Sequence, residues 1–283
     1  MDTALYEQRR GPELRARLLG AKIHSAADRG EVERVALFDE AQVRVILLDI
    51  EGTTTPIDFV YKTLFPYASR KLESFLRENS ANPEIGALIE DLRAQHELDE
   101  RNGLKPPSWR DDSEEERMRS SAAYGQWLIA RDSKCTALKS LQGKIWQQGY
   151  ASGELKGEVY PDVPAAFERW KRKGKIIGIY SSGSVLAQQL LFGSIPAGDV
   201  TRYISVFFDT RVGAKTDAES YRKIGASFSE EPKRFLFISD SSKETEVAQL
   251  AGMQALLCER GPHATAPPGA QKVIHDFEGV FAD

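Results

Sequence analysis

The sequence predicts an α/β fold with a doubly wound parallel sheet and an inserted α-helical cap domain. Three observations lead to this fold. Apolar runs of strand length alternate with helical segments over residues 159–283. An earlier apolar run over residues 43–48 has the pattern of a strand that is buried on both faces. Between these regions, residues 57–158 show helical spacing without a convincing strand.

Composition limits the function classes. The chain has 283 residues, of which 41% are hydrophobic, so it can form one large domain or two smaller ones. A net charge of −4 argues against a broad nucleic-acid surface, and no apolar run is long enough to cross a bilayer. Cys135 and Cys258 fit no metal spacing and are typical of a reducing cytoplasm. We expect a cytoplasmic monomer that binds a small molecule, and neither nucleic acid nor membranes.

The segment before the first strand carries no recognisable chemistry. Residues 13–23 could form a short helix, but Gly11, Gly20 and Gly30 weaken any longer one. We interpret residues 1–42 as an N-terminal extension of unknown role.

The predicted cap occupies residues 57–158, and residues 43–56 and 159–283 form the predicted core. The helical segments of the cap are expected at 57–79, 83–100 and 114–149, with breaks near Asp132 and Gly143. An exposed loop is expected at 101–113. Trp109, Trp127 and Trp146 lie in this region. Helix packing is the favoured interpretation for most of them, and an apolar pocket is the alternative.

The core is expected to contain four further strands and four helices. The strands are predicted at 174–180, 203–208, 234–238 and 254–258. The helices are predicted at 163–173, 185–192, 218–228 and 243–251.

Polar side chains follow several of these strands. Asp49 and Glu51 follow the strand at 43–48, and Ser181 and Ser182 follow the strand at 174–180. Lys215 comes after the strand at 203–208, and Asp240 comes after the strand at 234–238. Because parallel strands bring their carboxyl ends to one edge of the sheet, we expect these groups to meet there.

This set of side chains suits phosphoryl transfer. Asp49 and Asp240 offer the hard oxygen ligands that Mg²⁺ prefers. Asp49 can attack phosphorus and form an aspartyl-phosphate, while Glu51 protonates the leaving oxygen and then activates water. Lys215 supplies positive charge. The loop that contains Ser181 and Ser182, which we call the serine loop, can bind phosphate oxygens at the start of a helix. Each element alone is more often a turn, a helix cap or a solvated charge. Their shared order after four strands is much less expected by chance.

The order of these motifs resembles that of the haloacid dehalogenase superfamily of phosphatases. The resemblance is closer to the enolase-phosphatase family of methionine salvage. It rests on Leu-Asp-Ile-Glu-Gly-Thr-Thr-Thr-Pro-Ile at 48–57, Tyr-Ser-Ser-Gly-Ser at 180–184, Ala-Gln-Gln-Leu-Leu-Phe-Gly at 187–193, Phe-Asp-Thr at 208–210, Glu-Ser-Tyr-Arg-Lys-Ile at 219–224, and Thr-Ala-Leu-Lys-Ser-Leu-Gln-Gly at 136–143 followed by Trp146. The glutamate of Asp-Ile-Glu is specific, because most relatives in the superfamily have aspartate there.

The resemblance implies a bifunctional enzyme. It would convert 2,3-diketo-5-methylthiopentyl-1-phosphate to the acireductone 1,2-dihydroxy-3-keto-5-methylthiopentene and phosphate. It also implies a Mg²⁺ site at Asp49, Glu51 (through its main-chain carbonyl) and Asp240, and substrate contacts at Ser181, Ser182 and Lys215. Asp49, Glu51 and Lys215 are the expected catalytic residues.

For the enolisation step, Glu51 is our candidate for proton transfer. Mg²⁺ or Lys215 are the candidates for stabilising the enolate. As a hypothesis, the longer side chain of glutamate reaches further than that of aspartate.

Two departures from the family pattern stand out. Forty-two residues precede the catalytic unit, which usually begins close to the N-terminus. The next acid after Asp240 is Glu244, which is either an outer partner of the metal site or an acid in a first helical turn. Two other functions stay open: a phosphatase of the same fold acting on another sugar phosphate, and a non-catalytic scaffold that binds a phosphometabolite.

Overall fold

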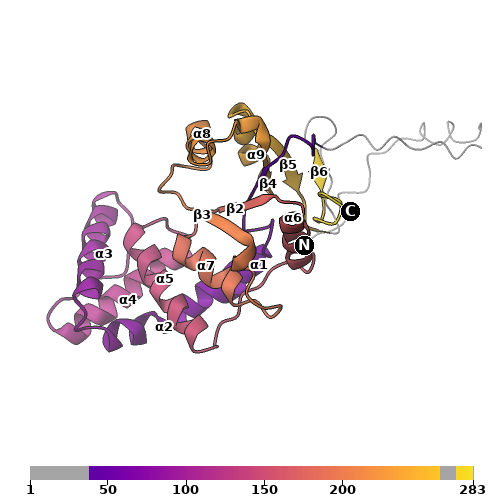
Figure 1. The fold of residues 1–283 in the computed structure, drawn as a ribbon. Coiled ribbons are helices and arrows are strands. Elements are labelled where there is room, and N and C mark those ends of the chain that lie inside the picture. Colours follow the sequence, from indigo (N-terminus) through magenta and orange to yellow (C-terminus); the bar gives the residue numbers. More distant parts are fainter. Residues whose placement is uncertain (1–37, 262–271, 283) are drawn as a thin grey trace, which may run out of the picture. The chain divides into compact units, whose positions relative to one another are not determined.

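The computed structural model describes residues 38–261 and 272–282. The possible helix at 13–23 and most of the extension at 1–42 lie outside this part of the chain. A parallel sheet with strand order β3-β2-β1-β4-β5-β6 takes all of its strands except β1 from the C-terminal half of the chain (Figure 1). Its strands are β1 Val45–Leu48, β2 Ile176–Tyr180, β3 Ile204–Phe208, β4 Phe235–Ser239, β5 Gln254–Cys258 and β6 Val273–Ile274. The last of these is two residues long and was not predicted, because so short a run carries no periodicity.

The strand order reverses at β1. Val45 pairs with Ile176 of β2 on one side and with Phe235 of β4 on the other. Strands β2 and β3 extend the sheet in one direction, and β4, β5 and β6 extend it in the other. Ligands of open α/β sheets bind at such a reversal, beyond the carboxyl ends of the strands. Asp49, the residue after β1, lies there, with its N–H donating to Ile238 O at 3.0 Å.

Helices cover both faces of the sheet, as expected for a doubly wound fold. Alternate residues of β1 point to opposite faces. Ile46 and Leu48 belong to the apolar cluster of α6 Val163–Arg172 and α7 Val185–Gly193. Val45 and Leu47 belong to the cluster of α8 Ala218–Ser227 and α9 Ser242–Leu250. The predicted fold class is therefore confirmed.

A block of helices is inserted between β1 and α6. We call them the inserted helices: α1 Ile57–Phe59, a π-helical segment Val60–Leu64, α2 Phe65–Glu78, α3 Pro83–Arg101, α4 Glu114–Ala130 and α5 Thr136–Ala151. Where the chain leaves and re-enters the core, Tyr160 N donates to Thr54 O at 2.9 Å. The two connections are thus hydrogen-bonded to each other.

One of the two expected helix breaks is confirmed and the other is wrong. Asp132, with φ of 49°, separates α4 from α5. Helix α5 runs without interruption through Gly143. A glycine in a helix costs only about 1 kcal/mol, which tertiary packing outweighs. A Cβ on buried Gly143 would lie 3.7 Å from Ser184 Oγ, so α5 passes close to the start of α7.

The π-helical segment has an identifiable cause. Pro66 in the first turn of α2 has no N–H, which disturbs the hydrogen-bond ladder before it. Phe65 N donates to Val60 O, five residues back. Trp146 Nε1 of α5 donates to Leu64 O at 2.9 Å. Segments of this kind occur often at functional sites.

Within residues 38–261 and 272–282, we find no helix with both the length and the apolar character needed to cross a membrane.

Candidate active site

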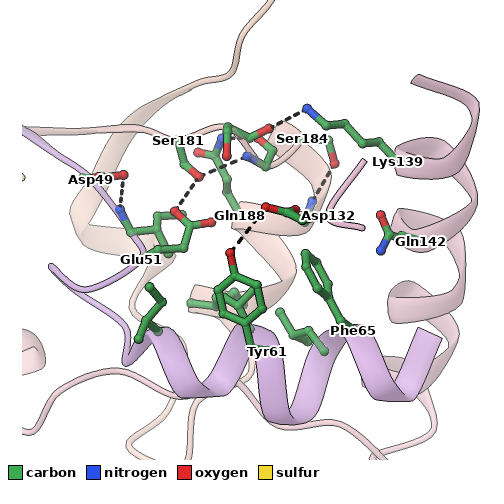
Figure 2. Close-up of a pocket in the computed structure, with 18 of the residues that line it drawn as sticks. Asp49, Glu51, Tyr61, Phe65, Asp132, Lys139, Gln142, Ser181, Ser184 and Gln188 are labelled. Carbon is green, nitrogen blue, oxygen red and sulfur yellow. Dashed lines mark hydrogen bonds between the residues drawn. The ribbon is translucent and has the colours of Figure 1, made fainter. Parts of the chain in front are cut away.

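A pocket of about 330 Å³ lies where the strand ends meet the inserted helices (Figure 2). Six residues expected at the site line it, and we call them the strand-end cluster: Asp49, Glu51, Ser181, Ser182, Lys215 and Asp240. The structure therefore brings together all the site residues predicted from the sequence. Other lining residues come from the inserted helices and α7, including Tyr61, Phe65, Lys139, Gln142, Trp146 and Gln188.

Asp49 is held rigidly at the base of the pocket. The residue is only 3% exposed. Its Oδ1 accepts a hydrogen bond from Ile50 N at 2.7 Å and lies 2.6 Å from Lys215 Nζ. Its Oδ2 lies 3.0 Å from Ser239 Oγ at the end of β4. A carboxylate fixed in this way loses little freedom when it attacks a bound substrate.

Lys215 lies between two carboxylates. Its Nζ is 2.6 Å from Asp49 Oδ1 and 2.6 Å from Glu244 Oε2. Tyr221 OH of α8 donates to the Lys215 carbonyl at 2.9 Å and so positions the loop. Burial by itself would lower the pKa of Lys215, but Asp49 and Glu244 outweigh it, so the pKa is raised. The ammonium is therefore charged at neutral pH.

Glu51 turns its side chain toward the serine loop. Ser181 Oγ donates to Glu51 Oε2 at 3.3 Å, and Gly183 N donates to Ser181 Oγ at 3.1 Å. Burial raises the pKa of Glu51, and the charge of Asp49 adds to the shift. A carboxyl group with a raised pKa is suited to accepting and returning a proton.

Asp240 approaches the backbone that follows Glu51. Its N–H donates to Thr53 Oγ1 at 2.9 Å. A Cβ added to Gly52, which has φ of +69°, would lie 2.2 Å from Asp240 Oδ2. Loss of solvent around the carboxyl, followed by the charge of Asp49, raises the pKa of Asp240 to about 6.

These groups fit a magnesium ion in part. Among the described residues, no set of three or more His, Cys, Asp or Glu side chains could hold a metal ion. Mg²⁺ is usually held by one or two carboxylates, with water and phosphate oxygens completing its ligands. Asp49 and Asp240 supply two carboxylates whose mutual repulsion a cation would relieve. The Glu51 side chain is bound to Ser181, so only its main-chain carbonyl would be available.

We expect Gly52→Ala to disrupt the site. The left-handed backbone at this position costs about 1–2 kcal/mol for an L-residue, and the new Cβ would displace Asp240. Gly153→Ala is the matched control, because Gly153 has φ of +75° but no atom within 4 Å of an added Cβ. Urea unfolding should show a loss of stability in both variants, and a larger one in Gly52→Ala because of the added clash with Asp240. Turnover should fall only in Gly52→Ala. Equal activity in the two variants would contradict a close approach between Gly52 and the Asp240 carboxylate.

Comparisons with known proteins agree with the resemblance noted in the sequence. The family model of haloacid dehalogenase-like hydrolases matches residues 43–252. Enolase-phosphatase E1 of Synechococcus elongatus is 47% identical over 236 residues, which cover 83% of this chain and 97% of the relative. The chain belongs to the enolase-phosphatase family. It is therefore an enzyme of the hydrolase class.

Two further proteins are similar to this chain. Enolase-phosphatase E1 of Drosophila melanogaster is 44% identical, with 84% of this chain and 93% of the relative covered. The crystal structure of the UTR4 protein of Saccharomyces cerevisiae is similar at a TM-score of 0.67 and 32% identity. That match covers 84% of this chain and all of the yeast chain.

The structure defines the surroundings of Glu244, for which two interpretations were open. Its Oε2 contacts Lys215 Nζ and lies 3.0 Å from Ser239 Oγ. Its N–H donates to Ser241 Oγ, which caps α9. Burial and the charge of Asp49 raise the pKa of Glu244 to about 7. Glu244 is thus both an acid of the first helical turn and a partner of the lysine; its relation to a metal stays a prediction.

Sequence reasoning did not single out the polar residues that the inserted helices and α7 contribute. Gln188 Nε2 donates to Gly183 O at 2.8 Å and to Phe208 O at 2.9 Å, which ties the serine loop to β3. Tyr61 OH lies 3.4 Å from Asp132 Oδ2 at the pocket (Figure 2). The family motifs at 187–193 and 136–143 contain Gln188 and Lys139, and this was the available signal.

Of the three tryptophans in the region between β1 and α6, one lies at the pocket and two pack against helices. Trp146 lines the pocket. Trp109 and Trp127 instead pack on Tyr124 within the inserted helices, at ring distances of 6.2 and 5.7 Å.

Proposed function

We propose that this protein catalyses the two-step conversion of 2,3-diketo-5-methylthiopentyl-1-phosphate to the acireductone 1,2-dihydroxy-3-keto-5-methylthiopentene and phosphate. The first step would enolise the diketone, and the second would remove the phosphate. This assignment follows the enolase-phosphatase relatives and uses the strand-end cluster for both steps.

One observation carries the proposal: a single pocket joins the strand-end cluster to an apolar wall. That wall comes from the inserted helices and α7 and consists of Ile57, Val60, Leu64, Phe65, Trp146 and Leu191. The substrate has a charged phosphate at one end and a methylthio group at the other. The two halves of the pocket match these two ends in polarity.

For phosphate removal, Asp49 would attack phosphorus and form an aspartyl-phosphate. Lys215 would hold Asp49 in place and balance charge, and Ser181 and Ser182 would bind phosphate oxygens. Asp49, Asp240 and the Glu51 carbonyl would hold Mg²⁺, which would neutralise charge on the phosphate. Glu51 would protonate the leaving oxygen and then accept a proton from water. The segments 43–56 and 159–283 would form the catalytic core, with 57–158 as a cap that excludes water from the intermediate.

The alternatives predict different outcomes of one assay. The purified protein is mixed with the diketo-phosphate and Mg²⁺, and the enol absorbance and the released phosphate are followed together. Enol formation followed by phosphate release supports the proposal. Phosphate release from unrelated sugar phosphates, without any enolisation, would replace it with a general phosphatase. Absence of all turnover would leave the binding scaffold.

Glu51→Asp is expected to separate the two steps. The shorter side chain withdraws the carboxylate from Ser181 Oγ, which lies 3.3 Å away in the wild type. Displacement of a catalytic group by about 1 Å can cost about 100-fold in rate. We expect enolisation to fall by about this factor. Hydrolysis of an ester that needs no enolisation should change less than about 10-fold, because most relatives in the superfamily have aspartate at this position. A variant that performs both steps at the wild-type rate would remove Glu51 from the enolisation mechanism.

A further inference from the structure

We propose that Lys139 of α5 is a further catalytic residue, whose ammonium group binds the C2 carbonyl oxygen of the diketone and protonates it as the enol forms. The inference rests on the proposed function, because only a substrate with a carbonyl beside the phosphate ester would need such a group. The sequence pointed instead to Mg²⁺ or Lys215 as the group that stabilises the enolate, and Lys215 comes from the core rather than from the inserted helices.

The first support is position. Lys139 lines the same pocket as the strand-end cluster, and its Nζ donates to Ser182 O at 3.3 Å. Figure 2 shows the side chain extending from α5 toward the serine loop that would bind phosphate. In the substrate a single carbon separates the phosphate ester oxygen from the C2 carbonyl. A cation beside the serine loop, on the side of the inserted helices, therefore lies near the oxygen on which enolate charge develops.

The second support is that the other lysines of the pocket are engaged. Lys215 is held by two carboxylates, and Lys134 Nζ lies 2.8 Å from Asp132 Oδ1. Among the residues that the structure describes, no carboxylate lies within ion-pair distance of Lys139. Its ammonium group instead donates to the neutral carbonyl of Ser182. This ammonium can therefore turn to a substrate oxygen without breaking an ion pair.

The environment also favours proton donation. Burial lowers the pKa of Lys139, and the positive charge of Lys134 adds to the effect. Asp209, Asp132 and Glu51 oppose the shift without cancelling it. An ammonium with a lowered pKa is a stronger acid and a better partner for a developing enolate.

The step balances without another reactant. Glu51 accepts the proton from C1, and the C1–H electron pair forms the C1=C2 bond. The C2=O π pair moves to oxygen, which takes a proton from Lys139. The products are the neutral enol, a protonated Glu51 and a neutral amine that regains its proton from solvent. Glu51 then holds the proton that the leaving oxygen needs in the second step.

The competing explanation is structural: Lys139 could simply hold α5 to the serine loop through Ser182. A phosphonate analogue of the diketo-phosphate, in which a methylene replaces the ester oxygen, separates the catalytic role from the structural one. In D₂O with Mg²⁺, NMR follows enzyme-catalysed exchange of the C1 protons, which reports enolisation without phosphate release. Hydrolysis of n-hexyl phosphate, which has no carbonyl, reports phosphoryl transfer alone.

Lys139→Met is the test variant, and Lys144→Met is the matched control on the same helix. Lys144 pairs with Glu84 at 2.8 Å and does not line the pocket. We expect Lys139→Met to slow deuterium exchange about 100-fold, as for loss of an oxyanion donor. Hydrolysis of hexyl phosphate should change less than about 3-fold, and Lys144→Met should match the wild type in both assays.

Three results would overturn the inference. Exchange at the wild-type rate in Lys139→Met removes the residue from enolisation. An equal loss in both assays assigns it the structural role. A wild-type protein that hydrolyses hexyl phosphate but neither exchanges the analogue nor converts the diketo-phosphate refutes the proposed function, and the inference with it.

Discussion

Asp49→Asn is expected to abolish phosphate release, with kcat lowered at least about 10⁴-fold, as for loss of a catalytic nucleophile. The amide keeps the size of the side chain and one oxygen acceptor, which can serve either Ile50 N or Ser239 Oγ, because these donate to different oxygens of Asp49. It removes the negative charge and the nucleophilic oxygen that would form the aspartyl-phosphate. Phosphate release from hexyl phosphate with Mg²⁺ measures the effect on phosphoryl transfer alone.

The control for Asp49→Asn is the same substitution at Asp58. Asp58 is exposed and forms an i,i+4 ion pair with Lys62, so its loss should leave kcat unchanged. Circular dichroism should show both variants folded. Phosphate release by Asp49→Asn within about 10-fold of the wild type would exclude Asp49 as the nucleophile.

Asp162→Ala is expected to lower the free energy of unfolding by about 3–5 kcal/mol. Both carboxylate oxygens of Asp162 lie 2.8 Å from Arg260 Nη1, and the two side chains are only 11% and 6% exposed. Phe277 N also donates to Asp162 Oδ2 at 2.7 Å. The substitution leaves the guanidinium buried without its counter-charge, which costs far more than an exposed ion pair contributes.

Urea unfolding measures the loss, with Glu219→Ala as control. Glu219 pairs with Arg222 at 3.2 Å, and both side chains are about half exposed, so that loss should be about 0–1 kcal/mol. Arg260 Nε also donates to Thr53 O in the loop after Asp49. We therefore expect Asp162→Ala to lower kcat as well. Equal stability losses in the two variants would show that the buried pair contributes no more than a surface pair.

The strands and the strand-end cluster were predictable because their signals are local. Each buried strand is a short apolar run, and its carboxyl end is marked by a change to polar residues. A parallel sheet then brings those ends to one edge, so the meeting of Asp49 with Asp240 follows from topology. The motifs shared with enolase-phosphatases narrowed the predicted function from a general phosphatase to that family. The similar proteins confirmed the family.

The missed features depend on contacts between segments far apart in sequence. The π-helical segment takes its form from Pro66 and from Trp146 on another helix. The expected break at Gly143 was wrong because packing outweighs the intrinsic cost of a helical glycine. The Asp162–Arg260 pair joins residues 98 positions apart, and no periodicity signals it. The side chains of the inserted helices that line the pocket are positioned by packing between distant segments, and a single sequence does not show that packing.

The hydrogen bond between Tyr160 N and Thr54 O has a consequence for how substrate range can change. Since the chain leaves and re-enters the core at adjacent points, the intervening segment closes a loop whose ends are already fixed. The entropy of loop closure grows only slowly with length. Insertions, deletions or exchanges between these points therefore place little strain on the sheet. A lineage can remodel the part of the apolar wall that the inserted helices form while it keeps the strand-end cluster unchanged.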